Sequence, residues 1–295
     1  MNQIVLPLIS TAIREATHRP FDVHAATPIG GGSINETFRL EATNGERYFL
    51  KLNDARHHSM FEAEAAGLET IIATNTLRVP QPVAFGIAGE RSYLVLEYLE
   101  LRPRGNSGLL GELLAAMHRC GNDRFGYIRD NFIGTTPQPN AWKESWFEFW
   151  RERRLGFQLR VASNNDYGSQ IQSLGEKLLV SLPAFFAGYT PEPSLLHGDL
   201  WGGNHAFLPD GTPVIFDPAP YYGDRECDIA MTELFGGFPA SFYSSYRAAW
   251  PLDSGYEHRR DLYNLYHVLN HANLFGGGYV QQAKGIMQRL LSETG

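Results

Sequence analysis

Residues 197–204 read HGDLWGGN, and residues 213–217 read PVIFD, a short apolar run that ends in an acid. In the first stretch the carboxylate of Asp199 is followed five residues later by the amide of Asn204. A carboxylate can accept a proton from a hydroxyl group, and carboxylate and amide oxygens are ligands that suit Mg²⁺. The two stretches therefore predict a catalytic base, Asp199, and two metal ligands, Asn204 and Asp217.

The spacing of Asp199 and Asn204 matches the catalytic loop of protein kinases, H-R-D-x-x-x-x-N. In that loop the acid accepts the proton of the substrate hydroxyl and the asparagine binds Mg²⁺. Asp217 would correspond to the second metal-binding acid, which in protein kinases begins the DFG motif. An isolated HGD tripeptide is usually an ordinary turn whose polar side chains cap backbone groups. The three residues in this order, with a strand between them, favour phosphoryl transfer from ATP.

A glycine-rich turn, GGGS at residues 30–33, lies in the N-terminal part of the chain. Glycine has no Cβ, so its backbone N–H groups can approach phosphates closely. We therefore expect the backbone of Gly31, Gly32 and Ser33 to cover the phosphates of ATP. The turn alone is weak evidence, because it matches neither GxGxxG nor the P-loop pattern.

Lys51 lies on the expected strand that follows this turn, and Glu64 lies in the helix after it. Kinases place a lysine on such a strand to bind the α- and β-phosphates, and a glutamate on the next helix to hold it. Glu62 is a rival for this role, but Ser59 and Glu62 have the spacing of a capping box. We therefore expect Glu64 to pair with Lys51.

The order of the expected elements predicts an α+β protein with a protein-kinase-like, two-lobe fold. Asn44-Gly45 between two alternating runs is a strong hairpin signal. The small N-terminal lobe, residues 1–99, is expected to have an antiparallel β-sheet and one main helix, and the C-terminal lobe, residues 100–295, to be mostly helical. The expected strands include 37–42, 47–52, 83–87, 92–98 and 213–218. The expected helices are 3–17, 59–74, 108–119, 140–161, 167–182, 224–235, 239–249, 257–274 and 279–292.

The composition is that of a globular enzyme. The chain has 295 residues, of which 43% are hydrophobic and 19% charged, and its formal net charge is -7. Binding to duplex nucleic acid needs a basic face, so we expect no nucleic-acid partner. No apolar run is long enough to cross a membrane. The two cysteines, Cys120 and Cys227, form no CxxC pair, which favours a reducing cytoplasm, and a monomer is the default expectation.

Several longer stretches resemble the fructosamine kinase, or ketosamine 3-kinase, family. They are HGDLWGGN, the following IFDPAPYYGDRECDIA (215–230), TTPQPNAWKESWFEFWRERRL (135–155) and LYNLYHVLNHANLFGGGY (262–279). HGDLW with GGN is more specific than HGD, which the aminoglycoside and choline kinases share. The resemblance runs from the glycine turn to about Tyr279. It implies the aminoglycoside-phosphotransferase variant of the kinase fold.

Members of this family transfer the γ-phosphate of ATP to the 3-hydroxyl of ketosamines, the sugars that form on lysine side chains and small amines. The product sheds its sugar, which repairs the glycated amine. The resemblance thus implies ATP and Mg²⁺, and a small ketosamine or a glycated lysine as substrate. It assigns Asp199 as the base, Asn204 and Asp217 as metal ligands, and Lys51 with Glu64 as the phosphate-binding pair.

The resemblance also matches Glu97, Tyr98 and Leu99 to the hinge whose backbone meets adenine. Trp201 stands inside the catalytic loop and Glu226 follows it, so either could contact the substrate. Glu226 could instead be structural.

Other readings stay open from the sequence. A kinase of the same fold could act on an aminoglycoside, choline or a sugar, and a catalytically dead nucleotide-binding module is a third reading. Asp217 is followed by Pro218-Ala219 instead of Phe-Gly, so the activation switch of protein kinases is not expected.

Some further residues have a structural and a functional interpretation. The aromatic stripe within residues 142–150 is more typical of core than of a sugar-stacking surface. His267 and His271 are expected to be polar residues of the core or of a cleft wall instead of a metal pair. Asp228 is expected to cap a helix or to brace the catalytic loop.

Overall fold

The structure is a computed structural model, which describes residues 5–30, 34–165, 167 and 169–294. The chain divides into two compact units. The first unit combines Met1–Asn106 with His205–Pro218, and the second combines Ser107–Asn204 with Ala219–Gly295. The chain therefore passes from one unit to the other three times, and the segment that ends in Asp217 belongs to the N-terminal unit.

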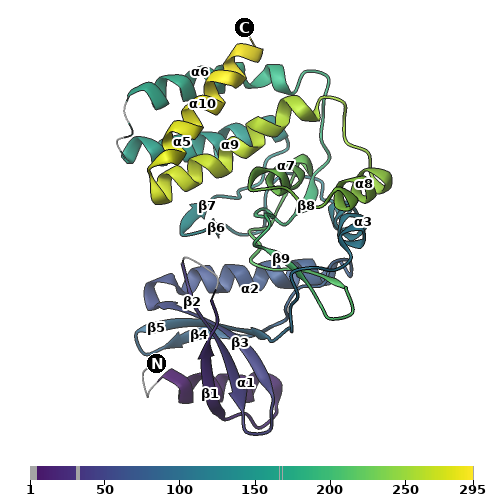
Figure 1. Cartoon of the computed structure of the whole chain (residues 1–295). Helices are drawn as coiled ribbons and strands as arrows, with labels where there is room; N and C mark the ends of the chain where they lie inside the picture. Colours follow the sequence, from purple (N-terminus) through teal and green to yellow (C-terminus); the bar gives the residue numbers. More distant parts are fainter. Residues whose placement is uncertain (1–4, 31–33, 166, 168, 295) are drawn as a thin grey trace. The chain divides into compact units, whose positions relative to one another are not determined.

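The first unit contains a five-stranded antiparallel sheet with the strand order β1-β2-β3-β5-β4 (Figure 1). Its strands are β1 (Val23–Pro28), β2 (Glu36–Ala42), β3 (Arg47–Asp54), β4 (Pro82–Ala88) and β5 (Arg91–Glu97). The expected hairpin at Asn44-Gly45 is confirmed, and Gly45 adopts a φ of 82° that few other residues tolerate. The α+β class is likewise confirmed.

Two helices pack against this sheet, α1 (Val5–Thr17) and α2 (His58–Ala73) (Figure 1). Side chains alternate between the faces of a strand, and Leu50 and Leu52 of β3 belong to the core cluster that includes Ile9 of α1. Lys51 lies between these two leucines, so its side chain points to the other face, where it meets Glu64 of α2. The alternation of β3 thus positions the lysine.

The expected capping box at Ser59 and Glu62 is wrong. A 3₁₀ turn, Ala55–His57, precedes α2, and the carboxylate of Asp54 accepts the N–H of Arg56 at its start. This turn leads directly into the helix, so Ser59 lies inside the first turn of α2 instead of before it. Glu62 therefore has no capping-box role.

The segment His205–Pro218 forms a small hairpin of β9 (His205–Phe207) and β10 (Pro213–Ile215). The backbones of Phe207 and Arg102 exchange two hydrogen bonds, of 2.7 and 2.9 Å, and the N–H of Ile215 donates to the carbonyl of Arg78 at 3.0 Å. These bonds attach the hairpin to the N-terminal part of the chain, which brings Asp217 into the same unit as Lys51.

The second unit is mostly helical, as expected. Its helices are α3 (Ser107–His118), α4 (Trp146–Phe149), α5 (Gly156–Asn164), α6 (Ser169–Phe185), α7 (Glu226–Leu234), α8 (Ala240–Ala249), α9 (Tyr256–Phe275) and α10 (Gly278–Glu293). Two short strand pairs join them: β6 (Asn131–Ile133) with β7 (Thr136–Gln138), and β8 (Ser194–Leu196) with β11 (Tyr221–Gly223). Within the described ranges, no helix combines the length and the apolar character that a membrane span requires.

The single helix expected at 140–161 is wrong in its first part. Helix α4 begins only after Ser145, whose hydroxyl accepts the N–H of Glu148, and a π-helical turn, Trp150–Leu155, separates it from α5. A Cβ on Gly156 would lie 2.4 Å from the carbonyl oxygen of Arg151, so glycine is needed for this turn. Trp146, Phe149 and Trp150 are buried, which confirms the core interpretation of the stripe.

Candidate active site

The ammonium group of Lys51 lies between two carboxylates of the first unit. Its Nζ donates to Oε1 of Glu64 at 2.6 Å and to Oδ1 of Asp217 at 2.7 Å. Burial alone would lower the pKa of Lys51, but the charges of Asp217 and Glu64 raise it above its usual value. The lysine is therefore a fixed positive charge, and the structure brings together three residues that are far apart in sequence.

Asp217 has an unusual backbone conformation. It is one of the few described non-glycine residues with a positive φ, which is 58°. A left-handed conformation is unfavourable for a side chain and persists only where the surroundings enforce it. Its side chain is 46% exposed, and Lys51 bonds to Oδ1, so Oδ2 is left for a cation.

The expected hinge begins at the end of β5. The carboxylate of Glu97 binds the guanidinium of Arg78 and accepts the backbone N–H of Gln81 at 3.2 Å. The side chain of Glu97 is thus held by Arg78, and the next two residues, Tyr98 and Leu99, are half-buried. The other expected nucleotide contacts, Gly31, Gly32 and Ser33, lie outside the described residues.

The catalytic loop of the second unit links its two key side chains. Asn204 donates from Nδ2 to the carbonyl oxygen of Asp199 at 2.8 Å and to Oδ2 of the same residue at 3.2 Å. These bonds orient both side chains at once. They leave Oδ1 of Asn204 as a possible metal ligand, and Oδ1 of Asp199 is not bonded to Asn204. Asp199 is 23% exposed, so its carboxylate remains accessible.

Gly198 fixes the path of the loop next to Asp199. Its φ is 81°, and a Cβ at this position would lie 2.1 Å from the carbonyl oxygen of Ala219. The N–H of Ala219 in turn donates to the carbonyl of His197 at 2.9 Å. Any side chain at position 198 would therefore force the loop away from the connection that contains Ala219, between β10 and β11.

The carboxylate of Asp228, in α7, holds the backbone of the loop. Its two carboxylate oxygens accept the backbone N–H groups of His197 at 2.7 Å and Gly198 at 2.9 Å. The expected bracing role is confirmed, whereas the capping role is wrong, because α7 begins at Glu226 and Asp228 lies within its first turn. Buried carboxylates need such donors, since an unpaired buried charge is costly.

Asp228 in turn contacts His118, and His118 contacts Tyr246. Nε2 of His118 lies 3.1 Å from Oδ2 of Asp228, and Nδ1 lies 2.8 Å from the hydroxyl of Tyr246. A carboxylate can only accept, so Nε2 carries the proton. Burial tends to raise the pKa of Asp228, but its bond to His118 and the nearby charges lower it below its usual value. Sequence patterns missed His118, because 110 positions separate it from Asp228.

His267 of α9 is the other side chain near the base. Its Nδ1 lies 3.9 Å from Oδ1 of Asp199, which is too far for a hydrogen bond. Burial and the neighbouring His271 lower the pKa of His267 to about 3, so the ring is neutral. His267 is therefore a buried polar residue beside the catalytic carboxylate, in agreement with the expected core or cleft-wall position.

The two expected substrate contacts have different surroundings. Trp201 is 40% exposed, and its ring meets the edge of Phe235 with the ring centroids 6.2 Å apart. Glu226 is fully buried, and both of its oxygens accept from Arg259, at 2.7 and 3.0 Å. The structure thus offers the surface of Trp201 to a ligand, whereas the carboxylate of Glu226 is occupied by Arg259.

The proposed metal ligands suit Mg²⁺ by their chemistry. Among the residues that the structure describes, no three His, Cys, Asp or Glu side chains gather as a ready-made metal site. Oδ1 of Asn204 takes no part in the bonds to Asp199, and Oδ2 of Asp217 takes no part in the bond to Lys51. Mg²⁺ prefers hard oxygen ligands of this kind. Mg²⁺ commonly uses only one or two protein ligands together with substrate phosphates, so the chemistry of each residue suits the ion.

Comparison with known proteins gives the family. The model of the fructosamine kinase family matches residues 5–293. A Synechocystis protein named as a probable ketoamine kinase is 47% identical over 288 residues, which cover 96% of each chain. An Arabidopsis protein named protein-ribulosamine 3-kinase, chloroplastic, is 44% identical over 267 residues, which cover 89% of this chain and 81% of the relative.

Solved structures agree with this result. A crystal structure from Haemophilus somnus, assigned as a fructosamine-3-kinase, superposes with a TM-score of 0.88 at 30% identity and covers 96% of both chains. A structure of the aminoglycoside phosphotransferase APH(4)-Ia, at 15% identity and a TM-score of 0.62, shares the fold and covers 96% of this chain. The fold is thus that of the aminoglycoside-phosphotransferase-like kinases, and the chain belongs to the fructosamine kinase family.

Proposed function

We propose that this protein is an ATP-dependent kinase that phosphorylates the 3-hydroxyl of ketosamines on glycated amines. The observation that carries the proposal is the pairing of Asp199 with Asn204 in the braced loop, in a chain of the fructosamine kinase family. The relatives named as ketoamine and ribulosamine kinases support the substrate class.

Asp199 is the proposed general base. The bond from Asn204 to Oδ2 orients the carboxylate, and Oδ1 is the atom that would accept the proton of the sugar hydroxyl. As the proton leaves, the hydroxyl oxygen attacks the γ-phosphorus and the bond to the β-phosphate oxygen breaks, with ADP as the leaving group. The bonds from Asp228 to the loop backbone hold Asp199 in place without contacting the substrate.

Lys51 is the proposed ligand of the α- and β-phosphates, and Glu64 positions it. Asn204 and Asp217 would hold Mg²⁺, which neutralises charge on the β- and γ-phosphates when it is bound. Lys51 bonds to Asp217 in the described state, so phosphate oxygens would meet a lysine that is already charged and oriented. Such preorganisation lowers the barrier, because the site does not have to reorganise during the reaction.

Trp201 is the proposed substrate contact. Its exposed ring lies two residues from the base and could pack on the sugar or on the aliphatic arm of a glycated lysine. We assign Glu226 to support instead, because its carboxylate is bonded to Arg259.

The test is ADP release from Mg²⁺-ATP with ribulose-lysine, fructose-lysine, choline or kanamycin as the acceptor. We expect turnover on a ketosamine, and a loss of about a hundredfold or more in Asp199→Asn, the usual range for a general base. Asp123→Asn, which changes an exposed acid, is the matched control and should keep full activity.

Turnover only on kanamycin or choline would replace the substrate class and keep the mechanism. Near-full activity of Asp199→Asn would remove Asp199 from its role. Tight binding of ATP with no turnover on any acceptor would favour a binding module.

A further inference from the structure

The second unit contains a pocket that the proposed reaction does not use. It has a volume of about 290 Å³, and a neighbouring pocket of about 160 Å³ shares Glu192, Ser194 and Trp250 with it. Pockets of this size suit a small organic molecule. Neither pocket is lined by Asp199, Asn204 or Trp201.

Arg119 supplies a positive charge at this pocket. Its guanidinium lies 4.5 Å from the ring centroid of Trp250, and Nη2 donates to the carbonyl of Ala249 at 2.9 Å. An arginine side chain has five N–H donors, and in the described part of the chain the side chain of Arg119 makes this one hydrogen bond. Arg119 is therefore held in place and still has donors for a ligand.

Arg225, in the neighbouring pocket, differs from Arg119. Its guanidinium lies 4.1 Å from the ring centroid of Trp250, and it donates to the hydroxyl of Tyr246 and to the carbonyls of Trp250 and Pro251. These bonds make it a support for the wall of the neighbouring pocket, which the acids Glu192 and Asp224 also line.

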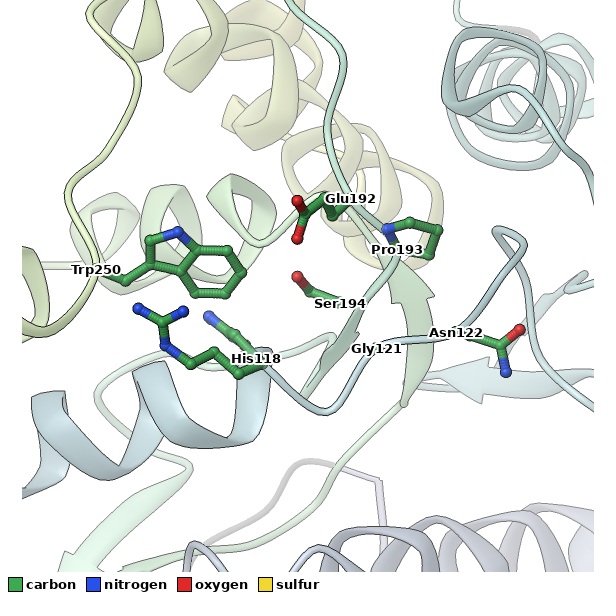
Figure 2. A pocket seen from close by; sticks show the side chains of 8 residues that line it. His118, Gly121, Asn122, Glu192, Pro193, Ser194 and Trp250 are labelled. Carbon is green, nitrogen blue, oxygen red and sulfur yellow. The ribbon is translucent and has the colours of Figure 1, made fainter.

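Glu192 and Ser194 lie opposite these groups. Figure 2 shows the carboxylate of Glu192 and the hydroxyl of Ser194 directed toward the indole of Trp250. Ser194 is 1% exposed, whereas Glu192 is an exposed residue, and within the described ranges its carboxylate forms no hydrogen bond or ion pair with the protein.

We propose that this pocket binds a small zwitterion of the α-amino-acid type. The ligand carboxylate would pair with Arg119 and accept from the hydroxyl of Ser194, and its ammonium group would pair with Glu192. A simple anion would face the carboxylate of Glu192, and a simple cation would face the guanidinium groups of Arg119 and Arg225. A zwitterion carries a group of opposite charge for each of them.

The site also shares a wall residue with the catalytic loop's brace. His118 lines the pocket and bonds to Asp228, which holds the backbone of His197 and Gly198. His118 itself is fully buried, so it connects the pocket wall to the loop through two successive hydrogen bonds without being exposed to a ligand.

Isothermal titration calorimetry with glycine, L-leucine and L-lysine tests the proposal on the full-length protein. We expect at least one of the three to bind, and Arg119→Gln and Glu192→Gln each to weaken that binding about tenfold or more. Arg247→Gln and Glu176→Gln change exposed residues outside the pocket and should keep the wild-type affinity. Thermal unfolding of each variant checks that it is folded.

Acetate and methylammonium, which carry one charge each, are the ligand controls and should bind at least tenfold more weakly than the best amino acid. Asp199→Asn should bind the amino acid as well as the wild type does, so the result is independent of kinase activity. Absence of binding for all three amino acids at millimolar concentration would overturn the proposal. So would equal affinity in Arg119→Gln and Glu192→Gln, or acetate binding as tightly as glycine.

Discussion

Lys51 shows how far single residues can be assigned from sequence. The order of Lys51, Glu64, Asp199, Asn204 and Asp217 along the chain predicted a nucleotide site, and the structure brings the first two together with Asp217. The choice of Glu64 over Glu62 rested on a capping box that does not exist. What selects Glu64 is the geometry of α2, which directs its carboxylate to Nζ of Lys51.

This choice can be tested by exchanging each glutamate of α2 for glutamine. We expect Glu64→Gln to lower kcat/KM for ATP by about tenfold, through a higher KM or a lower kcat. The change removes a buried, charge-assisted bond that positions Lys51. Glu62→Gln lies on the same helix and should stay within about twofold of the wild type, since Nζ of Lys51 bonds to Glu64 and Asp217. Steady-state kinetics with varied ATP provides the comparison, and equal effects of the two changes would refute the assignment.

His267 leads to a prediction about pH. Its pKa is lowered to about 3 by burial and by His271, whereas in the unfolded chain it should be near its usual value of about 6.5. Between these values the unfolded chain takes up a proton that the folded protein does not. This contribution to stability is therefore present above about pH 6.5 and is lost as the pH falls toward about 3.

The test is urea unfolding of the wild type and His267→Gln at several pH values between about 6.5 and 4. The free energy of unfolding should fall more steeply with decreasing pH in the wild type, because glutamine does not titrate. His258→Gln, which changes an exposed histidine, should keep the wild-type slope. A parallel slope in His267→Gln would show that this histidine does not control acid stability.

At the scale of elements, the catalytic loop depends on backbone geometry that its motif only partly shows. The sequence GD suggests a turn, but not that Gly198 needs a φ of 81° or lies against Ala219. Nor does it show that Asp228 and His118 hold the loop, since contacts between distant segments leave no periodic signal. The π-helical turn at Trp150–Leu155 was missed for a similar reason, because the same aromatic spacing fits an ordinary helix.

Two glycines of this loop provide a matched pair of substitutions. Gly198→Ala should cost about 2 kcal/mol or more of unfolding free energy and displace Asp199, because the new Cβ would clash with a carbonyl oxygen at a strained φ. Gly202→Ala meets nothing within 4 Å and should be tolerated. Chemical denaturation and turnover measured on both variants give the comparison. Equal stability of the two would contradict the close approach described here.

At the scale of the whole molecule, the α+β class and most helices of the second unit followed from hydrophobic periodicity and turn residues. Periodicity could not show which unit the segment His205–Pro218 joins. Its assignment to the first unit depends on backbone bonds to Arg78 and Arg102, which are more than 100 positions away. Such long-range pairings are decided by tertiary packing and not by local preference.

These bonds predict that residues 1–106 need the hairpin for stability. A fragment of residues 1–106 joined by a flexible linker to residues 205–218 should unfold at a higher temperature than residues 1–106 alone, because it restores β9 and β10. The same fusion with Phe207→Asp, which places a charge at a buried position, is the control. Identical melting curves for the fusion and for residues 1–106 would show that the hairpin adds nothing.

The three crossings between the units also limit how genes of this family can be recombined. A single crossover after residue 106 would join Lys51 and Glu64 from one parent to Asp217 from the other. In such a chimera the three residues come from two parents and were never selected together. Exchanging the whole first unit requires further breakpoints after residues 204 and 218, so shuffled libraries should use all three breakpoints and exchange both segments of the unit together.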